Sequence, residues 1–200
     1  MTNKFSKWLI TLSTGTLLSG CLSMPATQFY VLEPLSEQTS LATTTEKKRS
    51  IGIGPITIPA LLERKQLVTR LSDDTVTIAE FHQWASPLKD NVTQVLTHNL
   101  ATLQTGDVFR TYPWSAYGTV DYRIIIDIIR FDIHLDQRVN FVASWTIMHE
   151  KTHTLVSHGR SRIDQPLSDS SYPSVVKVLS KILSDFSQEL SLALEKLPPI

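Results

Sequence analysis

The sequence has one cysteine, Cys21, among its 200 residues, so no disulfide within the chain can support the fold. Neither sign of charge is in excess, because 19 Lys and Arg residues balance 19 Asp and Glu residues. This balance excludes the basic field that holds nucleic acid and gives no signal for a strongly charged ligand. Beyond the N-terminal region, no apolar run is long enough to cross a membrane. The apolar fraction of 42% is still sufficient for one hydrophobic core.

The N-terminal region has the layout of an export signal. Two lysines precede an apolar stretch over residues 8–18, which is too short to span a bilayer but fits a signal-peptide core. The small residues Ser19 and Gly20 lead to Cys21, whose thiol is the one side chain here able to take a diacylglyceryl group. We therefore expect residues 1–20 to be removed and Cys21 to carry a lipid. The alternative is an ordinary secreted protein with a stray cysteine.

The residues after Cys21 predict where the protein is held. Residues 21–28 form a short lipidated tether, and an extended chain reaches only about 3.3–3.6 Å per residue, so the folded domain is expected close to its membrane. In Gram-negative bacteria an aspartate directly after the lipidated cysteine retains a protein at the inner membrane, whereas here Leu22 and Ser23 follow. The sequence thus predicts the periplasmic face of the outer membrane, and the inner membrane is the less favoured location.

Residues 29–197 are expected to form one domain. Apolar patterning predicts strands over 29–32, 51–58, 67–71, 75–79, 108–112, 120–129, 139–147 and 154–163. Pro55 places the second of these strands at a sheet edge or makes it bulge. Two further segments, 88–103 and 175–194, carry apolar residues at helical spacing. We predict an α+β fold in which both amphipathic helices pack on one face of a mainly antiparallel or mixed sheet.

Local signals predict the ends of several elements. Ser86 is a suitable N-cap for the first helix, with Pro87 as its first residue and Gly106 as its stop. Pro173 is expected to begin the second helix. The segment 34–50 is rich in polar residues and is expected to be a mobile loop.

The sequence shows no pattern typical of a catalytic, cofactor or metal site. Three histidines are expected on a strand end, a turn and the next strand, which disfavours a metal site: His149, His153 and His158. There is no nucleophile elbow, and Gly52-Ile53-Gly54-Pro55 lacks the third glycine of a dinucleotide-binding loop. By strand parity, Asp127 and Asp132 face opposite sides, which disfavours a pair of acid and base carboxylates. No cofactor or metal is therefore predicted.

Two segments combine apolar or aromatic residues with charge, a composition typical of interface centres. They are 61–65, before the predicted hairpin, and 81–84, before the first helix, and both are expected to lie in loops. The second could be a binding patch or a staple that fixes how the chain enters the helix, and the structural role is favoured. Tyr112-Pro113-Trp114 allows the same two interpretations. The candidate partner contacts are Leu61, Leu62, Arg64, Phe81 and Trp84.

Several segments of the mature chain together resemble the PqiC-type lipoproteins, the auxiliary lipoproteins of ABC-type or MCE-type intermembrane transport systems. The likeness is carried, in the right order, by Phe29–Leu32 (FYVL), Ile51–Pro59 (IGIGPITIP), Leu61–Arg70 (LLERKQLVTR), Glu80–Leu88 (EFHQWASPL), Tyr112–Trp114 (YPW) and Arg130–Asp132 (RFD). It covers essentially the whole mature chain. The stretch from Ile51 to Leu88 is its most specific part.

The resemblance implies a non-enzymatic accessory subunit that supports lipid trafficking and envelope integrity. Members of the family work beside an MCE-domain membrane protein (PqiB-like) and an integral inner-membrane partner (PqiA-like). The resemblance implies no catalytic residues, so Cys21 is the one functional position transferred. A homo-oligomer stays open. So do two other functions, a lipid-anchored hydrolase acting on envelope lipid or peptidoglycan and an accessory lipoprotein of a different envelope complex.

Overall fold

The computed structural model describes residues 25–36, 49–135 and 137–197. The predicted signal peptide, Cys21 and most of the polar loop over 34–50 lie outside this part of the chain. The described residues form an eight-stranded sheet, two α-helices and two short 3-10 helices. The strands are β1 (Gln28–Tyr30), β2 (Ser50–Thr57), β3 (Gln66–Arg70), β4 (Val76–Trp84), β5 (Val108–Thr111), β6 (Tyr122–His134), β7 (Arg138–His149) and β8 (Thr154–Pro166). The helices are η1 (Ala60–Leu62), α2 (Leu88–Leu103), η2 (Ser115–Tyr117) and α3 (Tyr172–Glu195).

The sheet is mixed and is organised around β6. On one edge, β6 pairs antiparallel with β7, which pairs antiparallel with β8. On the other edge, β6 runs parallel to β2 over its first half and meets β3 at its last residue. Beyond these, β5 runs parallel to β2, while β4 pairs antiparallel with β3 and parallel with β1. The predicted α+β class is confirmed.

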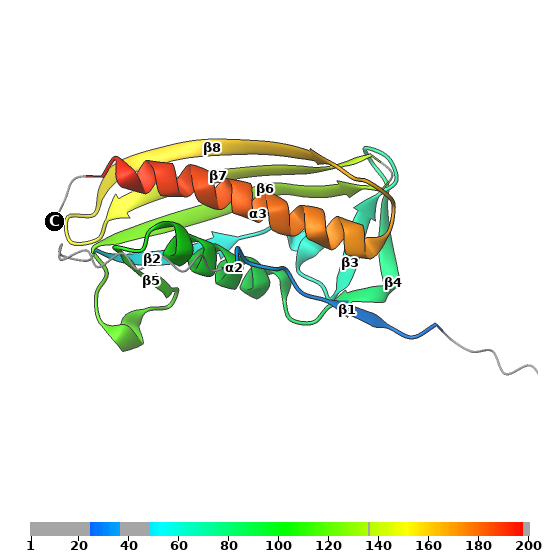
Figure 1. The fold of residues 1–200 in the computed structure, drawn as a ribbon, viewed down its shortest axis with the longest axis horizontal. Helices are drawn as coiled ribbons and strands as arrows, with labels where there is room; N and C mark the ends of the chain where they lie inside the picture. The colour runs from blue at the N-terminus through cyan, green and yellow to red at the C-terminus, as the bar shows by residue number, and fades with distance from the viewer. Residues whose placement is uncertain (1–24, 37–48, 136, 198–200) are drawn as a thin grey trace, which may run out of the picture.

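Both helices lie on the same face of the sheet, as Figure 1 shows. The predicted apolar stripes are the faces that they bury, because residues three and four apart share one side of a helix. The stripe of α2 includes Val92, Leu96 and Leu100, and that of α3 includes Leu179, Phe186 and Leu190. None of the helices in the described ranges is long and apolar enough to cross a membrane.

The first helix begins later than predicted. Ser86 precedes a proline, which favours an extended backbone, and Pro87 itself is the N-cap, with no side-chain capping bond. The carbonyl of Pro87 accepts from the backbone N–H of Asp90 and of Asn91 at 3.0 and 3.1 Å. The prediction that Ser86 caps this helix is therefore wrong, and the helix also ends before Gly106, at Leu103. In α3, by contrast, the Ser171 hydroxyl caps the helix just before Pro173.

Two bulges change which way the strand residues face. In β2 the register with β6 shifts between Ile53 and Ile56, and β2 lies between β5 and β6, so Pro55 is accommodated by a bulge rather than at an edge. In β6 the register with β7 shifts between Ile128 and Arg130. Because one extra residue reverses strand parity, Phe131 is buried like Ile128, although the two are three residues apart.

The bulge in β6 corrects a prediction about two carboxylates. Asp127 and Asp132 were expected on opposite faces, but the parity change puts both on the face away from the helices. They are engaged separately. The Asp127 carboxylate accepts from the Thr57 hydroxyl, and Asp132 forms ion pairs with Arg70 at 2.9 Å and Arg130 at 3.3 Å.

Candidate functional site

A cleft of about 580 Å³ opens at the beginning of α2. Its described lining combines apolar groups with three cationic and two acidic side chains. The apolar groups include Phe29, Ile58, Trp84 and Leu88, and the charged ones are Glu63, Arg64, Lys65, Lys89 and Asp90. A concave, largely apolar surface with a few charged groups is the usual form of a binding site.

Backbone hydrogen bonds fix the segments that surround the cleft. The N–H of Trp84 donates to the carbonyl of Lys65 at 2.6 Å, which ties the end of β4 to the segment after η1. The next N–H along the chain, that of Ala85, donates to the carbonyl of Tyr30 in β1 at 2.9 Å. Arg64 donates through Nε to the carbonyl of Leu61 at 2.9 Å. The cleft is therefore framed by segments with paired backbones.

An irregular ladder between β3 and β4 turns Trp84 into the core. Val68 pairs with Ile78 and Gln66 pairs with Gln83, so β4 takes five steps where β3 takes two. These extra residues let Ala79 and Trp84 both face inward, although their spacing in a regular strand would put them on opposite faces.

The structure brings the two predicted contact segments together but corrects their setting. Residues 61–62 lie in η1, and 81–84 lie in β4, so the expectation that the second segment is a loop is wrong. Trp84 is only 5% exposed and belongs to the core, whereas Arg64 and Phe81 are half-buried. Leu61 and Leu62 are also half-buried, and Leu62 packs against the core. The floor of the cleft is thus Trp84, and its rim carries Arg64.

His82 holds three elements together beside the cleft. Its ring stacks on that of Tyr172 at the start of α3, with centroids 3.8 Å apart, and its Nδ1 is 2.8 Å from the Tyr30 hydroxyl. Burial raises the pKa of both tyrosines above their usual range, and the neighbouring Tyr172 adds to the effect on Tyr30. At neutral pH both phenols are therefore protonated. The cluster is a joint between β1, β4 and α3.

The remaining histidines lie apart from the cleft. His149 bonds to the Thr152 hydroxyl at 3.0 Å beside the β7–β8 turn, where His153 has a positive φ of 53°. Within the described ranges, no group of three or more His, Cys, Asp or Glu residues is placed to hold a metal ion.

One packing unit escaped the sequence interpretation. A Cβ on Gly52 would lie 2.7 Å from the ring of Trp114, and Gly54 has a φ of +123° with Tyr112 packed against it. Gly52 leaves room for the ring of Trp114 and Gly54 for the Cβ of Tyr112, and the two aromatic rings meet edge to face. The signal was present as two glycines in one strand and a distant Tyr-Pro-Trp, but spacing does not show that they meet. Tyr112 also borders a second hollow of about 230 Å³ that shares Lys89 with the cleft.

Comparison with known proteins identifies the family. Residues 30–191 match the model of the family described as the ABC-type transport auxiliary lipoprotein component. The chain belongs to this family. It is 25% identical over 192 residues to the intermembrane transport lipoprotein PqiC of Escherichia coli K12, covering 96% of this chain and 99% of that protein, and equally to PqiC of Shigella flexneri. The predicted PqiC-type resemblance is confirmed.

Solved structures share the fold of this auxiliary lipoprotein. A crystal structure of an uncharacterised protein superposes with a TM-score of 0.71 at 20% identity, covering 85% of this chain and 99% of that one. Protein XCC0632 from Xanthomonas campestris superposes with a TM-score of 0.65 at 12% identity, covering 82% and 92%. These similarities support the mixed sheet with two helices.

Proposed function

We propose that this protein is a lipid-anchored accessory subunit of an MCE-type intermembrane lipid transport system and that it supports envelope integrity. It is held through Cys21 at the periplasmic face of the outer membrane, docks an MCE-domain partner similar to PqiB, works with an inner-membrane protein similar to PqiA, and catalyses no reaction. The observation that carries the proposal is the family match over residues 30–191. That match includes every described cleft-lining residue except Phe29.

The cleft and its rim form the proposed docking surface. Arg64 and Phe81 are accessible enough to contact a partner. Arg64 lines the cleft and bonds to the carbonyl of Leu61 in η1. Phe81 lies in β4 two residues before Gln83, which also lines the cleft. Trp84 is buried, lines the cleft and supports this surface. Aromatic and arginine side chains around a pocket are the residues that dominate binding energy at protein interfaces.

The rival hydrolase would need a nucleophile and a base in the same cleft. The described lining holds Ser86 as its hydroxyl and Glu63 and Asp90 as its carboxylates, with no histidine among these residues. The histidine hydrogen bonds of the described residues go to Tyr30 and Thr152 instead of a serine. The geometry therefore favours binding over hydrolysis.

Arg64→Glu and Phe81→Ala test the docking surface in the full lipidated chain. We expect each change to weaken binding of the MCE-domain partner by about 2 kcal/mol or more, because each removes or reverses a central contact. Co-purification from membranes measures the binding, and thermal melting checks the fold. Arg160→Glu, at an exposed position of β8, is the matched control and should leave binding unchanged.

Trp84→Ala separates support from contact. Because Trp84 is buried, its truncation should lower the free energy of unfolding by about 3–5 kcal/mol, and partner binding should fall with it. Docking at this surface is refuted if stable Arg64→Glu and Phe81→Ala proteins recover the partner as well as wild type does. A wild-type protein that binds no envelope partner but hydrolyses an envelope lipid would refute the whole proposal.

A further inference from the structure

The strand nearest to the predicted anchor exposes apolar side chains. In β1 and just after it, Phe29 is 64% exposed and Val31 is 53% exposed, while Leu32 is buried and Tyr30 packs against the core. Strand β1 is at the end of the sheet path and pairs with β4. Alternate residues of an extended chain share one face, so Phe29 and Val31 form an apolar edge directed to the outside. Contiguous exposed apolar side chains mark a surface that binds a protein or a membrane.

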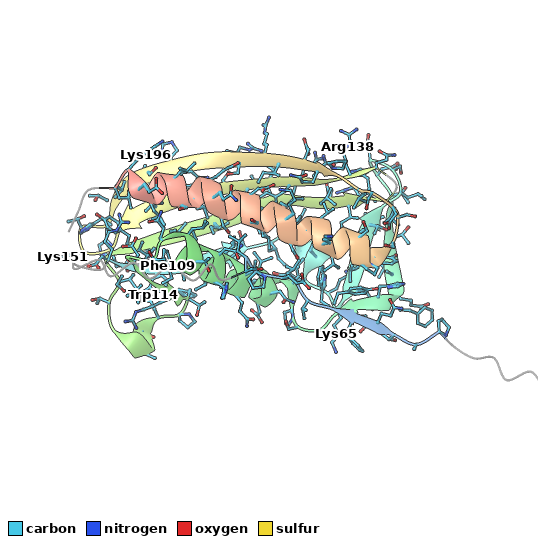
Figure 2. The ribbon with its side chains drawn as sticks, viewed as in Figure 1. Lys65, Phe109, Trp114, Arg138, Lys151 and Lys196 are labelled. Carbon is cyan, nitrogen blue, oxygen red and sulfur yellow. The ribbon has the colours of Figure 1, made fainter. Side chains whose placement is uncertain are left out.

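Cationic side chains lie beside this apolar edge. Phe29 pairs with Gln83 in β4. The N–H of Trp84, the next residue of β4, donates to the carbonyl of Lys65, so β4 lies between β1 and the segment that carries Lys65. Both line the cleft together with Arg64. Figure 2 shows Lys65 close to β1 in this view. Aromatic and apolar residues combined with Lys and Arg are the groups that favour the boundary between lipid headgroups and acyl chains.

The length of the tether limits where the membrane can be. Cys21 and Pro25, the first described residue, are four residues apart, so a fully extended chain separates them by at most about 14 Å. From Cys21 to Phe29 the limit is about 29 Å. A lipid on Cys21 therefore keeps β1 close to the bilayer surface, whereas the β7–β8 turn with Lys151 lies at the other end of the molecule in Figure 2.

We propose that β1 rests on the membrane, with Phe29 and Val31 inserted at the level of the headgroups and with the exposed Lys65 facing lipid phosphates. The partner of this surface is the lipid bilayer itself. The inference rests on lipidation of Cys21, which is part of the proposed function. Because Phe29 also lines the docking cleft, a protein bound there meets this subunit at the membrane surface.

A single reactive thiol tests the proposal in the lipidated protein. Cys21 is the only cysteine, and acylation blocks its sulfur, so Phe29→Cys introduces one site for an environment-sensitive fluorophore. The labelled protein is reconstituted in vesicles of phosphatidylethanolamine with phosphatidylglycerol as the minor lipid. We expect its emission to shift to shorter wavelength and to be quenched by lipids that carry a nitroxide near the headgroup. Val31→Cys should respond in the same way.

Leu155→Cys is the matched control, because Leu155 is 57% exposed and is the second residue of β8, next to the turn that carries Lys151. Its label should be neither shifted nor quenched, and thermal melting should show that all three variants fold. Equal quenching at positions 29 and 155, or none at either, would overturn the proposal. So would a label at position 29 that is protected only when the protein partner is added. A wild-type chain that fails to float with the vesicles would instead refute the lipid anchor, and this inference with it.

Discussion

At the scale of single residues, the absence of a side chain at Gly52 decides how two distant segments pack. The ring of Trp114 occupies the space that a Cβ on Gly52 would need, with ring carbons 2.7 to 3.0 Å from that position. The backbone of Gly54 adopts a positive φ that residues with a Cβ rarely adopt. The two glycines of Gly52-Ile53-Gly54-Pro55 are therefore explained by the packing of Tyr112 and Trp114, and not by a dinucleotide-binding loop.

Gly52→Ala should lower the free energy of unfolding by about 1–3 kcal/mol, because the added methyl group pushes the Trp114 ring out of a filled space. Thermal melting measures the loss. The control is the double variant Gly52→Ala, Trp114→Ala, in which the clash is absent. We expect a coupling energy of about 0.5–3 kcal/mol between the two positions. Strictly additive losses would contradict this explanation.

At the scale of secondary-structure elements, one buried amide joins three segments. Asn99 is 0% exposed on the apolar face of α2. Its Oδ1 accepts from the N–H of Leu35 at 2.7 Å, and its Nδ2 donates to the Ser187 hydroxyl of α3 at 3.2 Å. The Ser187 hydroxyl in turn donates to the carbonyl of Leu183. The segment after β1 is thereby held against both helices.

Asn99→Ala should cost about 1–3 kcal/mol of stability, because it leaves the partly buried Leu35 N–H and the buried Ser187 hydroxyl without this partner. We also expect faster hydrogen exchange at the Leu35 amide. The matched control is Thr93→Ala in the same helix, where the exposed hydroxyl bonds only to the carbonyl of Lys89. Unchanged exchange at Leu35 in a destabilised Asn99→Ala protein would show that the segment is held by other contacts.

At the scale of the whole molecule, the two helices cover one face of the sheet, and the chain leaves from β1 towards its N-terminus (Figure 1). In the proposed arrangement the lipid on Cys21 is the anchor, and each buried methylene contributes about 0.8 kcal/mol, so more than one acyl chain makes the attachment stable. Anchor and sorting signal can be tested separately.

Cys21→Ser should abolish lipidation and release the protein from the membrane fraction after a high-salt wash, because serine cannot replace the thiol as the lipid acceptor. Full retention of the serine variant would refute anchoring at this site.

Replacement of Leu22 and Ser23 by aspartate should keep the protein lipidated but move it from outer-membrane to inner-membrane fractions in a density gradient. A wild-type protein that travels with inner-membrane markers would overturn the outer-membrane location.

Much of the fold could be predicted from the sequence, because the spacing of apolar residues within one segment indicates whether it forms a helix or a strand. The alternation over Tyr122, Ile124 and Ile126 and the helical stripe over Val92, Leu96 and Leu100 identified buried faces that the structure confirms. The same spacing could have revealed Asn99, which lies on the buried stripe of α2. The export signal and the lipid on Cys21 are also predictions of the sequence alone, since both depend on a short linear pattern.

Only the tertiary structure decided how those elements meet. Strands β6 and β7 pair on both sides of the bulge after Ile128. The bulge adds one residue to β6, so Asp127 and Asp132 lie on the same face, although their spacing in a regular strand predicts opposite faces. The sequence predicted Trp84 as a partner contact, but the extra residues of β4 opposite β3 direct its side chain into the core, where it forms the floor of the cleft. The register of a strand depends on the strand that pairs with it. Whether a Cβ would clash with a ring, as at Gly52 and Trp114, depends on how two distant segments pack. The sequence of one segment alone therefore predicts neither the register nor the clash.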